Sequence, residues 1–226
     1  MTEGGRILVV FDVDGTLIDS QRMICGAMAL AFDTVGLPQP DRRSVLSIVG
    51  LSLPQAMERL VPDAPQAALE ALVTAYKAAF GHLRAEDAAH LFPGAAEALA
   101  RLSAREDVIL GIATGKSRRG LAHMLDAFGL TGTFATLQTA DDHPSKPHPA
   151  MLLAALAEAA VVPARSVMVG DTTYDIDMAR AAGMASIGVA WGYHDAAALR
   201  AAGASRVIDR FDALDRALDA ALGASV

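Results

Sequence analysis

Short runs rich in Val, Ile and Leu alternate with segments of helical periodicity along most of this chain, and this alternation limits the folds open to it. The expected strands are almost continuously apolar, which is typical of strands covered on both faces. They are residues 7–12, 108–114, 134–139, 166–170, 185–190 and 206–208. The expected helices between them are residues 94–104, 118–128, 149–160, 175–182, 196–202 and 211–222. The alternation predicts an α/β fold with a parallel sheet and helices on both faces.

The region between residues 19 and 87 breaks the alternation. It contains only helical patterns rich in Ala and Leu, separated by Gly and Pro, and we expect four helices there. These helices are residues 21–35, 42–48, 53–60 and 64–83. The sequence therefore predicts an all-helical cap, residues 19–87, inserted into a discontinuous core of residues 1–18 and 88–226.

Composition excludes several classes of partner. The formal net charge of −7 argues against a nucleic-acid groove and against an anionic membrane surface. The single cysteine, Cys25, cannot form an internal disulfide, which fits a reducing compartment. No apolar run reaches the roughly 20 residues of a membrane span, and the first six residues lack the apolar stretch of a signal peptide. We expect a cytoplasmic protein that is a monomer or a homodimer.

Four segments at strand ends carry polar residues suited to one site. They are Asp-Val-Asp-Gly-Thr at 12–16, Ile-Ala-Thr-Gly-Lys at 112–116, Ser-Lys-Pro-His-Pro at 145–149 and Val-Gly-Asp-Thr-Thr-Tyr-Asp at 169–175. The carboxyl ends of parallel strands form the ligand crevice of an open sheet, so the four segments are expected to meet there. Asp12 and Asp14 leave a strand end on the same face, where a cation or a proton must offset their repulsion. This pattern indicates magnesium-assisted phosphoryl transfer.

Each segment also has a purely structural interpretation. The aspartates of the first segment could form a turn or a calcium loop. Thr114 could cap the following helix, Lys146 could be a solvated surface lysine, and Asp171 or Asp175 could be a helix cap. The order of the four segments and their position after apolar strands favour a shared site.

The four segments resemble the haloacid dehalogenase superfamily, in particular its phosphatases with a helical cap after the first strand of a Rossmann-like core. The resemblance covers nearly the whole chain, and the second and third segments are most similar to the phosphoglycolate-phosphatase-like branch. It implies an Mg²⁺-dependent phosphoric monoester hydrolase for a small phosphorylated metabolite, with 2-phosphoglycolate as the leading candidate. Pyrophosphatase, sugar-phosphate phosphatase, nucleotide phosphatase and a non-catalytic phospho-ligand-binding protein stay open as alternatives.

The resemblance also implies a chemical role for each acidic residue. Asp12 would be the nucleophile that forms an aspartyl-phosphate, and Asp14 would be the general acid and then the general base. Magnesium would bind Asp12, the backbone carbonyl of Asp14, and Asp171. Asp175 would support the site from nearby. The presence of Asp14 favours phosphoester chemistry over carbon–halogen cleavage.

The phosphate group has its own set of candidate residues. By the same resemblance, Thr114, Gly115 and Lys146 would hold its oxygens, and Thr114 and Lys146 would be catalytic together with the two aspartates of the first segment. Such positioning and charge compensation supply most of the catalysis in phosphoryl transfer.

Substrate choice is expected to lie with the cap. The resemblance places a specificity loop at Gly50 and Leu51, although Gly50 could equally be a helix stop. Arg22 is a cap-side cation that could meet the substrate, as are Arg42 and Arg43, although charged side chains are mostly solvated. Residues 191–194, Trp-Gly-Tyr-His, are interpreted as a turn rather than as the rim of the site.

Overall fold

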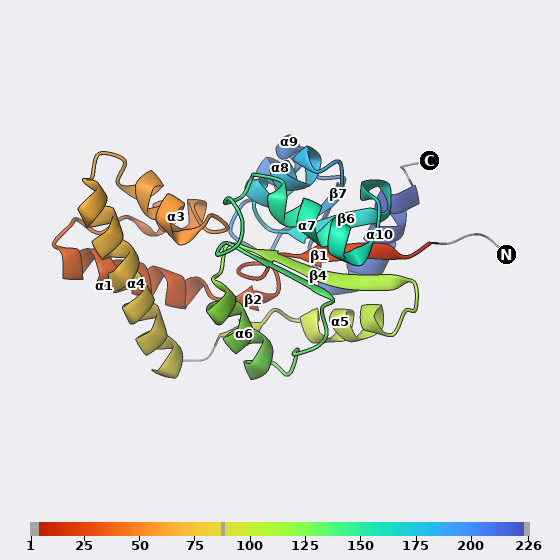
Figure 1. Cartoon of the computed structure of the whole chain (residues 1–226), viewed down its shortest axis with the longest axis horizontal. Coiled ribbons are helices and arrows are strands. Elements are labelled where there is room, and N and C mark those ends of the chain that lie inside the picture. The colour runs from red at the N-terminus through yellow and green to blue at the C-terminus, as the bar shows by residue number, and fades with distance from the viewer. Residues whose placement is uncertain (1–4, 87–88, 224–226) are drawn as a thin grey trace.

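A six-stranded parallel sheet forms the centre of the computed structural model, which describes residues 5–86 and 89–223 (Figure 1). The strand order is β5-β4-β1-β6-β7-β8, and every neighbouring pair is parallel. The strands are β1 (Ile7–Phe11), β4 (Val108–Thr114), β5 (Thr136–Thr139), β6 (Ser166–Gly170), β7 (Ala185–Val189) and β8 (Arg206–Ile208). The α/β fold expected from the sequence is confirmed.

Helices cover both faces of this sheet, as the apolar strands require. The two faces alternate along β1: Val9 and Phe11 pack with α5, α6 and α10, whereas Leu8 and Val10 pack with α7 and α8. In Figure 1, α5 and α6 lie below the sheet, and α7 and α8 lie above it. The helices are α5 (Ala95–Ser103), α6 (Arg118–Ala127), α7 (Ala150–Ala159), α8 (Thr173–Ala181), α9 (Ala196–Ala202) and α10 (Leu214–Gly223). Two short 3-10 turns, Pro163–Arg165 and Phe211–Ala213, precede β6 and α10.

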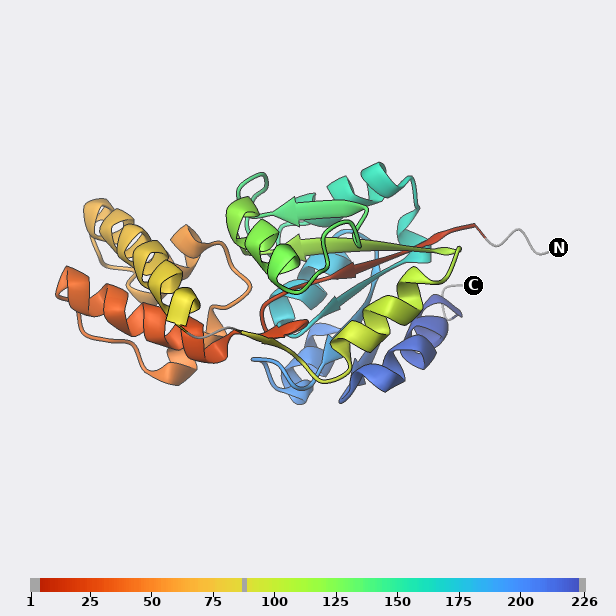
Figure 2. The ribbon, with the colours of Figure 1, turned by 90° about the horizontal axis from the view of Figure 1, so that it is seen from below.

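The cap helices, as we call α1 to α4, lie beside the sheet (Figures 1 and 2). They are α1 (Gln21–Val35), α2 (Arg42–Ser47), α3 (Leu53–Leu60) and α4 (Gln66–Glu86). They enclose a hydrophobic cluster of their own, in which Met28, Phe32, Met57 and Leu72 are almost fully buried. Among the described residues no helix is both long and apolar enough to cross a membrane.

The fourth cap helix begins two residues later than expected, at Gln66 instead of Ala64. The reason is Pro65, because a residue that precedes proline is disfavoured in helical conformation. The helix also continues beyond residue 83, to Glu86.

The sequence analysis missed one small sheet at the base of the cap helices. The strands β2 (Ile18–Asp19) and β3 (His90–Leu91) pair antiparallel, so the chain leaving the core lies against the chain returning to it. Strands of two residues carry no periodicity, and only their long-range pairing defines them. The expected boundary between residues 87 and 88 lies outside the described residues.

Candidate active site

Asp12 and Lys146 form the buried floor of the candidate site. Asp12 follows β1, and its N–H donates to the carbonyl of Val169 in β6 at 2.9 Å. Lys146 is completely buried, and its Nζ lies 2.7 Å from Asp12 Oδ1. This contact is an ion pair without hydrogen-bond geometry, so neither carboxylate oxygen of Asp12 has a hydrogen-bond partner among the described residues. Buried polar atoms normally have partners, which marks Asp12 as a binding position.

Asp171 and Asp175 stand beside Asp12 at the end of β6. One oxygen from each of the three carboxylates lies within 4.8 Å of the others. Asp171 Oδ1 accepts from the Thr16 hydroxyl at 2.9 Å, and its Oδ2 accepts from the Tyr193 N–H at 2.8 Å. The cluster is therefore anchored by chain segments far apart in sequence.

Asp175 fulfils both interpretations made from the sequence. Its Oδ2 accepts from the N–H and hydroxyl of Thr172, in a capping box at the start of α8. Its Oδ1 accepts from Lys146 Nζ at 2.7 Å. Asp175 therefore holds the Lys146 ammonium beside Asp12.

Burial dominates the electrostatics of the acidic cluster. Burial raises the pKa of Asp12 to about 7, although Lys146 opposes the shift. Burial and the charge of Asp12 raise the pKa of Asp171 well above its usual range. Burial disfavours the charged form of Lys146, but Asp12 and Asp175 outweigh it and raise the pKa of that ammonium. The cluster holds three buried carboxylates, and the one buried ammonium pairs with only two of them, Asp12 and Asp175, which favours binding of a further cation.

A magnesium ion fits this donor set. Mg²⁺ prefers carboxylate and carbonyl oxygens. The carboxylates of Asp12 and Asp171 supply such atoms in a buried place, and the oxygens of Asp12 accept no hydrogen bond from the described residues.

The Asp14 side chain has an ammonium partner of its own, outside the cluster of three carboxylates. The strand ends at Phe11, and the chain then turns through Gly15, whose φ is +85°. The strand geometry that would place alternate side chains on one face therefore does not extend to residue 14. Asp14 is held instead by Lys116, whose Nζ lies 2.7 and 2.6 Å from the two carboxylate oxygens.

Thr114 ends β4 at the same edge of the sheet, and Gly115 follows it. Thr114 is buried and does not cap α6, because Ser117 takes that position and accepts from the Gly120 N–H. The Thr114 hydroxyl oxygen instead accepts from the Lys116 N–H at 3.2 Å. The hydroxyl of Thr114 therefore serves the turn after β4 rather than the helix end.

The turn between α2 and α3 lies directly on these residues. A Cβ added at Gly115 would be 2.7 Å from the Gly50 carbonyl oxygen and 2.5 Å from that of Leu51. The next N–H, that of Ser52, donates to Ser145 Oγ at 2.7 Å. Gly50 and Leu51 thus contact the segments that carry Thr114 and Lys146. Arg22 is exposed on α1.

Sequence analysis missed the part played by residues 191–194. The indole N–H of Trp191 donates to the Thr16 carbonyl at 3.0 Å, and the Tyr193 N–H donates to Asp171. His194 Nδ1 accepts from the Thr173 N–H at the start of α8. Residues 191–194 form the expected turn, and this turn also anchors Asp171, a contact that the sequence did not indicate. Lys116 was missed too, although it stands two residues after Thr114.

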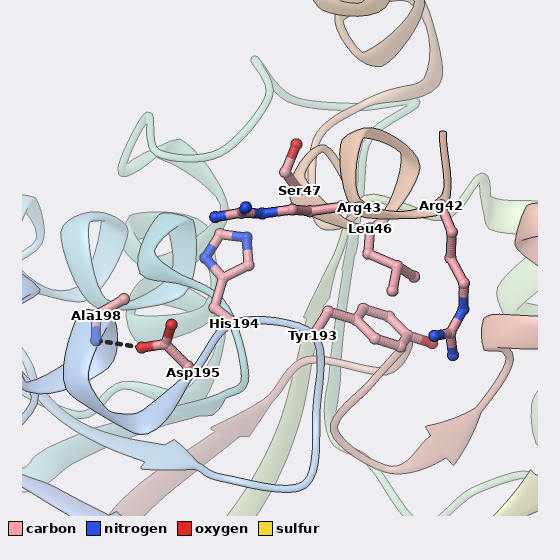
Figure 3. A pocket seen from close by; sticks show the side chains of 8 residues that line it. All are labelled: Arg42, Arg43, Leu46, Ser47, Tyr193, His194, Asp195 and Ala198. Atoms are coloured by element: carbon pink, nitrogen blue, oxygen red, sulfur yellow. Dashed lines mark hydrogen bonds between the residues drawn. The ribbon is translucent and has the colours of Figure 1, made fainter. Parts of the chain in front are cut away.

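Two clefts separate the cap helices from the core. One, of 430 Å³, lies between α2 and residues 193–198, and Figure 3 shows the side chains of Arg43 and His194 within it. The other, of 260 Å³, is lined by Leu51, Tyr174 and Lys146, among others. Lys146, whose ammonium pairs with Asp12, is thus among the residues that line the second cleft.

The family model of the haloacid dehalogenase-like hydrolases matches residues 9–189, from β1 to β7. The chain belongs to this family. The resemblance drawn from the four segments is thereby confirmed, as is the expectation of an enzyme of the hydrolase class.

Several relatives of this haloacid dehalogenase-like hydrolase carry phosphatase names, and others, 35% identical over 187 residues, are named tyrosine-protein kinase PtkA in Mycobacterium. The chain is 38% identical over 208 residues to a probable phosphatase, IndB, of Dickeya dadantii, covering 90% of each chain. It is 28% identical over 232 residues to a phosphoglycolate phosphatase of Salmonella choleraesuis, covering 93% of this chain and 91% of that protein. A crystal structure of a predicted phosphoglycolate phosphatase from Haemophilus somnus superposes with a TM-score of 0.84, covering 96% of this chain and 99% of that one. That pair is 24% identical, so the superposition establishes the shared fold.

Proposed function

We propose that this hydrolase is an Mg²⁺-dependent phosphatase of small phosphorylated metabolites, with phosphoglycolate as its first candidate substrate. The buried Asp12 carboxylate, paired with Lys146 and with no hydrogen-bond partner of its own, carries the proposal. The names of the two relatives support it. A pyrophosphatase, a sugar-phosphate phosphatase or a nucleotide phosphatase would need the same floor and would differ in the leaving group.

The proposed chemistry has two steps. The Asp12 carboxylate attacks phosphorus, the bond from phosphorus to the leaving oxygen breaks, and Asp14 gives that oxygen a proton. Asp14 then takes a proton from the water that attacks the aspartyl-phosphate, which releases inorganic phosphate and restores Asp12. The separate lysine partners of the two aspartates support a division of labour, because each carboxylate has its own electrostatic environment.

Other residues of the site would hold the metal and the phosphate. Side chains of Asp12 and Asp171, with the backbone carbonyl of Asp14, would hold Mg²⁺, and Asp175 would support them through Lys146. The bound ion would neutralise charge on the phosphoryl oxygens. The Thr114 O–H, the Gly115 N–H and the ammonium of Lys146 would hold the oxygens that do not leave.

We further propose that residues 19–87 act as a cap over a core of residues 1–18 and 88–226. The separate hydrophobic cluster of the cap helices supports this division. The turn at Gly50 and Leu51 would then take part in substrate choice, because it contacts Gly115 at the edge of the site. Arg22 is a further candidate from the cap, while Cys25 has no role in the proposed reaction.

Phosphate release from the purified chain tests the function. The panel contains phosphoglycolate, pyrophosphate, sugar phosphates and nucleotides, each with Mg²⁺ and with a chelator. We expect one strongly preferred substrate, no activity with the chelator, and no activity in Asp12→Asn. The control Asp126→Asn removes an exposed carboxylate of α6 and should retain activity. Release from none of the compounds by folded wild type would reject the phosphatase and favour a phospho-ligand-binding protein.

A further inference from the structure

Lys116 has no role in the chemistry proposed so far, yet it is bonded to the proposed acid. Its Nζ lies 2.7 Å from Asp14 Oδ1 and 2.6 Å from Oδ2. The side chains of both residues are only 13% exposed. The Ser20 hydroxyl donates to Asp14 Oδ1 at 2.5 Å, and it lies 3.1 Å from the Tyr193 hydroxyl. The ion pair is therefore fixed where the first strand passes into the cap helices.

An aromatic wall from α4 stands over this ion pair. Tyr76 and Phe80 stack with ring centroids 5.8 Å apart, and Lys116 Nζ lies over the Phe80 ring, 5.3 Å from its centroid. Burial and the nearby charge of Asp14 raise the pKa of the Tyr76 phenol, so this wall is uncharged. The ammonium thus sits between one carboxylate and an uncharged aromatic surface.

The leaving group of a substrate must enter this space. A general acid works within hydrogen-bond reach of the oxygen that it protonates, so the leaving alcohol would lie beside Asp14. Because Lys116 is in direct contact with Asp14, the same alcohol would lie within reach of the ammonium. An ammonium has three donors, and the two oxygens of Asp14 take at most two of them.

We propose that Lys116 is the residue that selects the leaving group, and that the preferred leaving alcohol carries a carboxylate close to the ester oxygen. This inference rests on the proposed phosphatase function. A carboxylate would use the remaining donor of Lys116 in a charge-assisted hydrogen bond, whereas a neutral group would leave that donor with only its weaker contact to the Phe80 ring. Because Lys116 and Asp14 are in contact, a substrate carboxylate bound to Lys116 would lie close to the ester oxygen beside Asp14. This short separation indicates phosphate esters of short hydroxy acids.

The arginines of the cap helices are less suited to this role. Arg42 donates to Gln21 Oε1 at 2.6 Å, and Arg43 lines the cleft between α2 and residues 193–198, on the side of His194 (Figure 3). Neither arginine is hydrogen-bonded to Asp14 among the described contacts, whereas Lys116 donates to both of its oxygens. Arg43 therefore serves as the rival in the test.

Binding of two matched phosphonates tests the selection without any turnover. In 3-phosphonopropionate a methylene replaces the ester oxygen of phosphoglycolate, and n-propylphosphonate lacks its carboxylate. Titration calorimetry on the full chain with Mg²⁺ should show the carboxylate-bearing ligand binding about 10- to 100-fold more tightly, as expected for a charged hydrogen bond. In Lys116→Met the ratio of the two affinities should fall to about one, and Lys116→Arg should restore part of it.

Two control variants and one activity assay separate the possible outcomes. Lys77→Met removes an exposed lysine one residue after Tyr76, and Arg43→Gln removes the rival cation; both should keep the wild-type ratio. The inference would be overturned if the wild type bound the two phosphonates equally well. It would also be overturned if the ratio of affinities were unchanged in both Lys116→Met and a second variant, Lys116→Gln. Loss of the ratio in Arg43→Gln would overturn it too. Hydrolysis of phosphate esters without carboxylate preference would retain the phosphatase and reject the selection. A Lys116-dependent preference in a chain without hydrolysis would retain the recognition and reject the reaction.

Discussion

The backbone N–H of Ser52 donates a 2.7 Å hydrogen bond to the hydroxyl of Ser145, so the turn after α2 is tied to the residue next to Lys146. Leu51 and Lys146 line the same cleft beside this bond. Any movement of the cap helices away from the core must break it. The bond thus ties the turn after α2 to the segment that carries Lys146.

Ser145→Ala should weaken the closed arrangement without disturbing the core. The net loss of one hydrogen bond, about 0.5–1.5 kcal/mol, lowers the fraction of closed molecules and should raise KM about 2- to 10-fold. Steady-state kinetics on the preferred substrate measure this. Ser103→Ala, at the exposed end of α5, should leave KM unchanged. An unaltered KM in Ser145→Ala would mean that the bond does not control closure.

Gly115→Ala should push the same turn away from the site. The new Cβ would lie 2.5 Å from the Leu51 carbonyl oxygen, closer than a carbon and a backbone oxygen can approach. We expect faster hydrogen exchange at residues 49–52 and a loss of about 10- to 100-fold in kcat/KM, as displacement of positioning groups produces. Gly81→Ala, where an added Cβ meets nothing within 4 Å, is the matched control. Wild-type exchange and kinetics in Gly115→Ala would contradict this close contact.

Lys146→Met should destabilise the fold as well as abolish activity. It leaves Asp12 and Asp175 buried without their ammonium, and the loss of one partner of a buried pair costs about 3–5 kcal/mol. Urea unfolding measures the change in the free energy of unfolding. Adding Asp175→Asn should recover part of the loss, because one uncompensated charge is removed. A change no larger than that in exposed Lys77→Met would show that this pair does not stabilise the fold.

Magnesium should stabilise the folded chain through Asp171. A ligand at 100 times its dissociation constant adds about 2.7 kcal/mol, which raises Tm by about 5–10 °C for a chain of this size. Asp171→Asn should lose most of that rise, because the amide removes the charge of one proposed ligand. Thermal unfolding over an Mg²⁺ titration is the measurement, with Asp126→Asn as the control. A full rise in Asp171→Asn would place the ion elsewhere.

Asp41, at the start of α2, should contribute to the stability of the fold in a way that is lost at acidic pH. Hydrogen bonds from the Ser44 N–H and hydroxyl, each 2.9 Å long, lower the pKa of Asp41 below its ordinary 3.8. The unfolded chain therefore binds the proton more readily, so this stability is complete above the ordinary pKa and is lost as pH falls through the folded pKa. Asp41→Asn keeps an acceptor but cannot titrate, so the Tm difference from wild type should shrink between about pH 6 and about pH 3. A difference that stays constant with pH would contradict this account.

Local sequence signals were enough to predict most of the fold. Apolar strand runs separated by helical periodicity gave the parallel sheet, and Gly- and Pro-bounded helical patterns gave the cap helices. These signals depend on residues near in sequence, because periodicity and turn chemistry act within a few residues. The pair β2–β3 lacked such a signal, since its two strands are formed by residues about 70 positions apart.

The candidate site divides in the same way. The sequence by itself determined which polar residues stand at strand ends. Asp12, Thr114 and Asp171 each stand at the end of an apolar run, and such a run is enough to predict the strand before them. Only the tertiary structure decided the partners: Lys146 with Asp12, Lys116 with Asp14, and the Tyr193 N–H with Asp171. Each pair joins segments far apart in the chain, and such contacts depend on how the strands are ordered in the sheet and where the cap helices come to rest. The sequence therefore indicates which reactive side chains the site contains, while the packing of distant segments decides which charged groups lie next to one another.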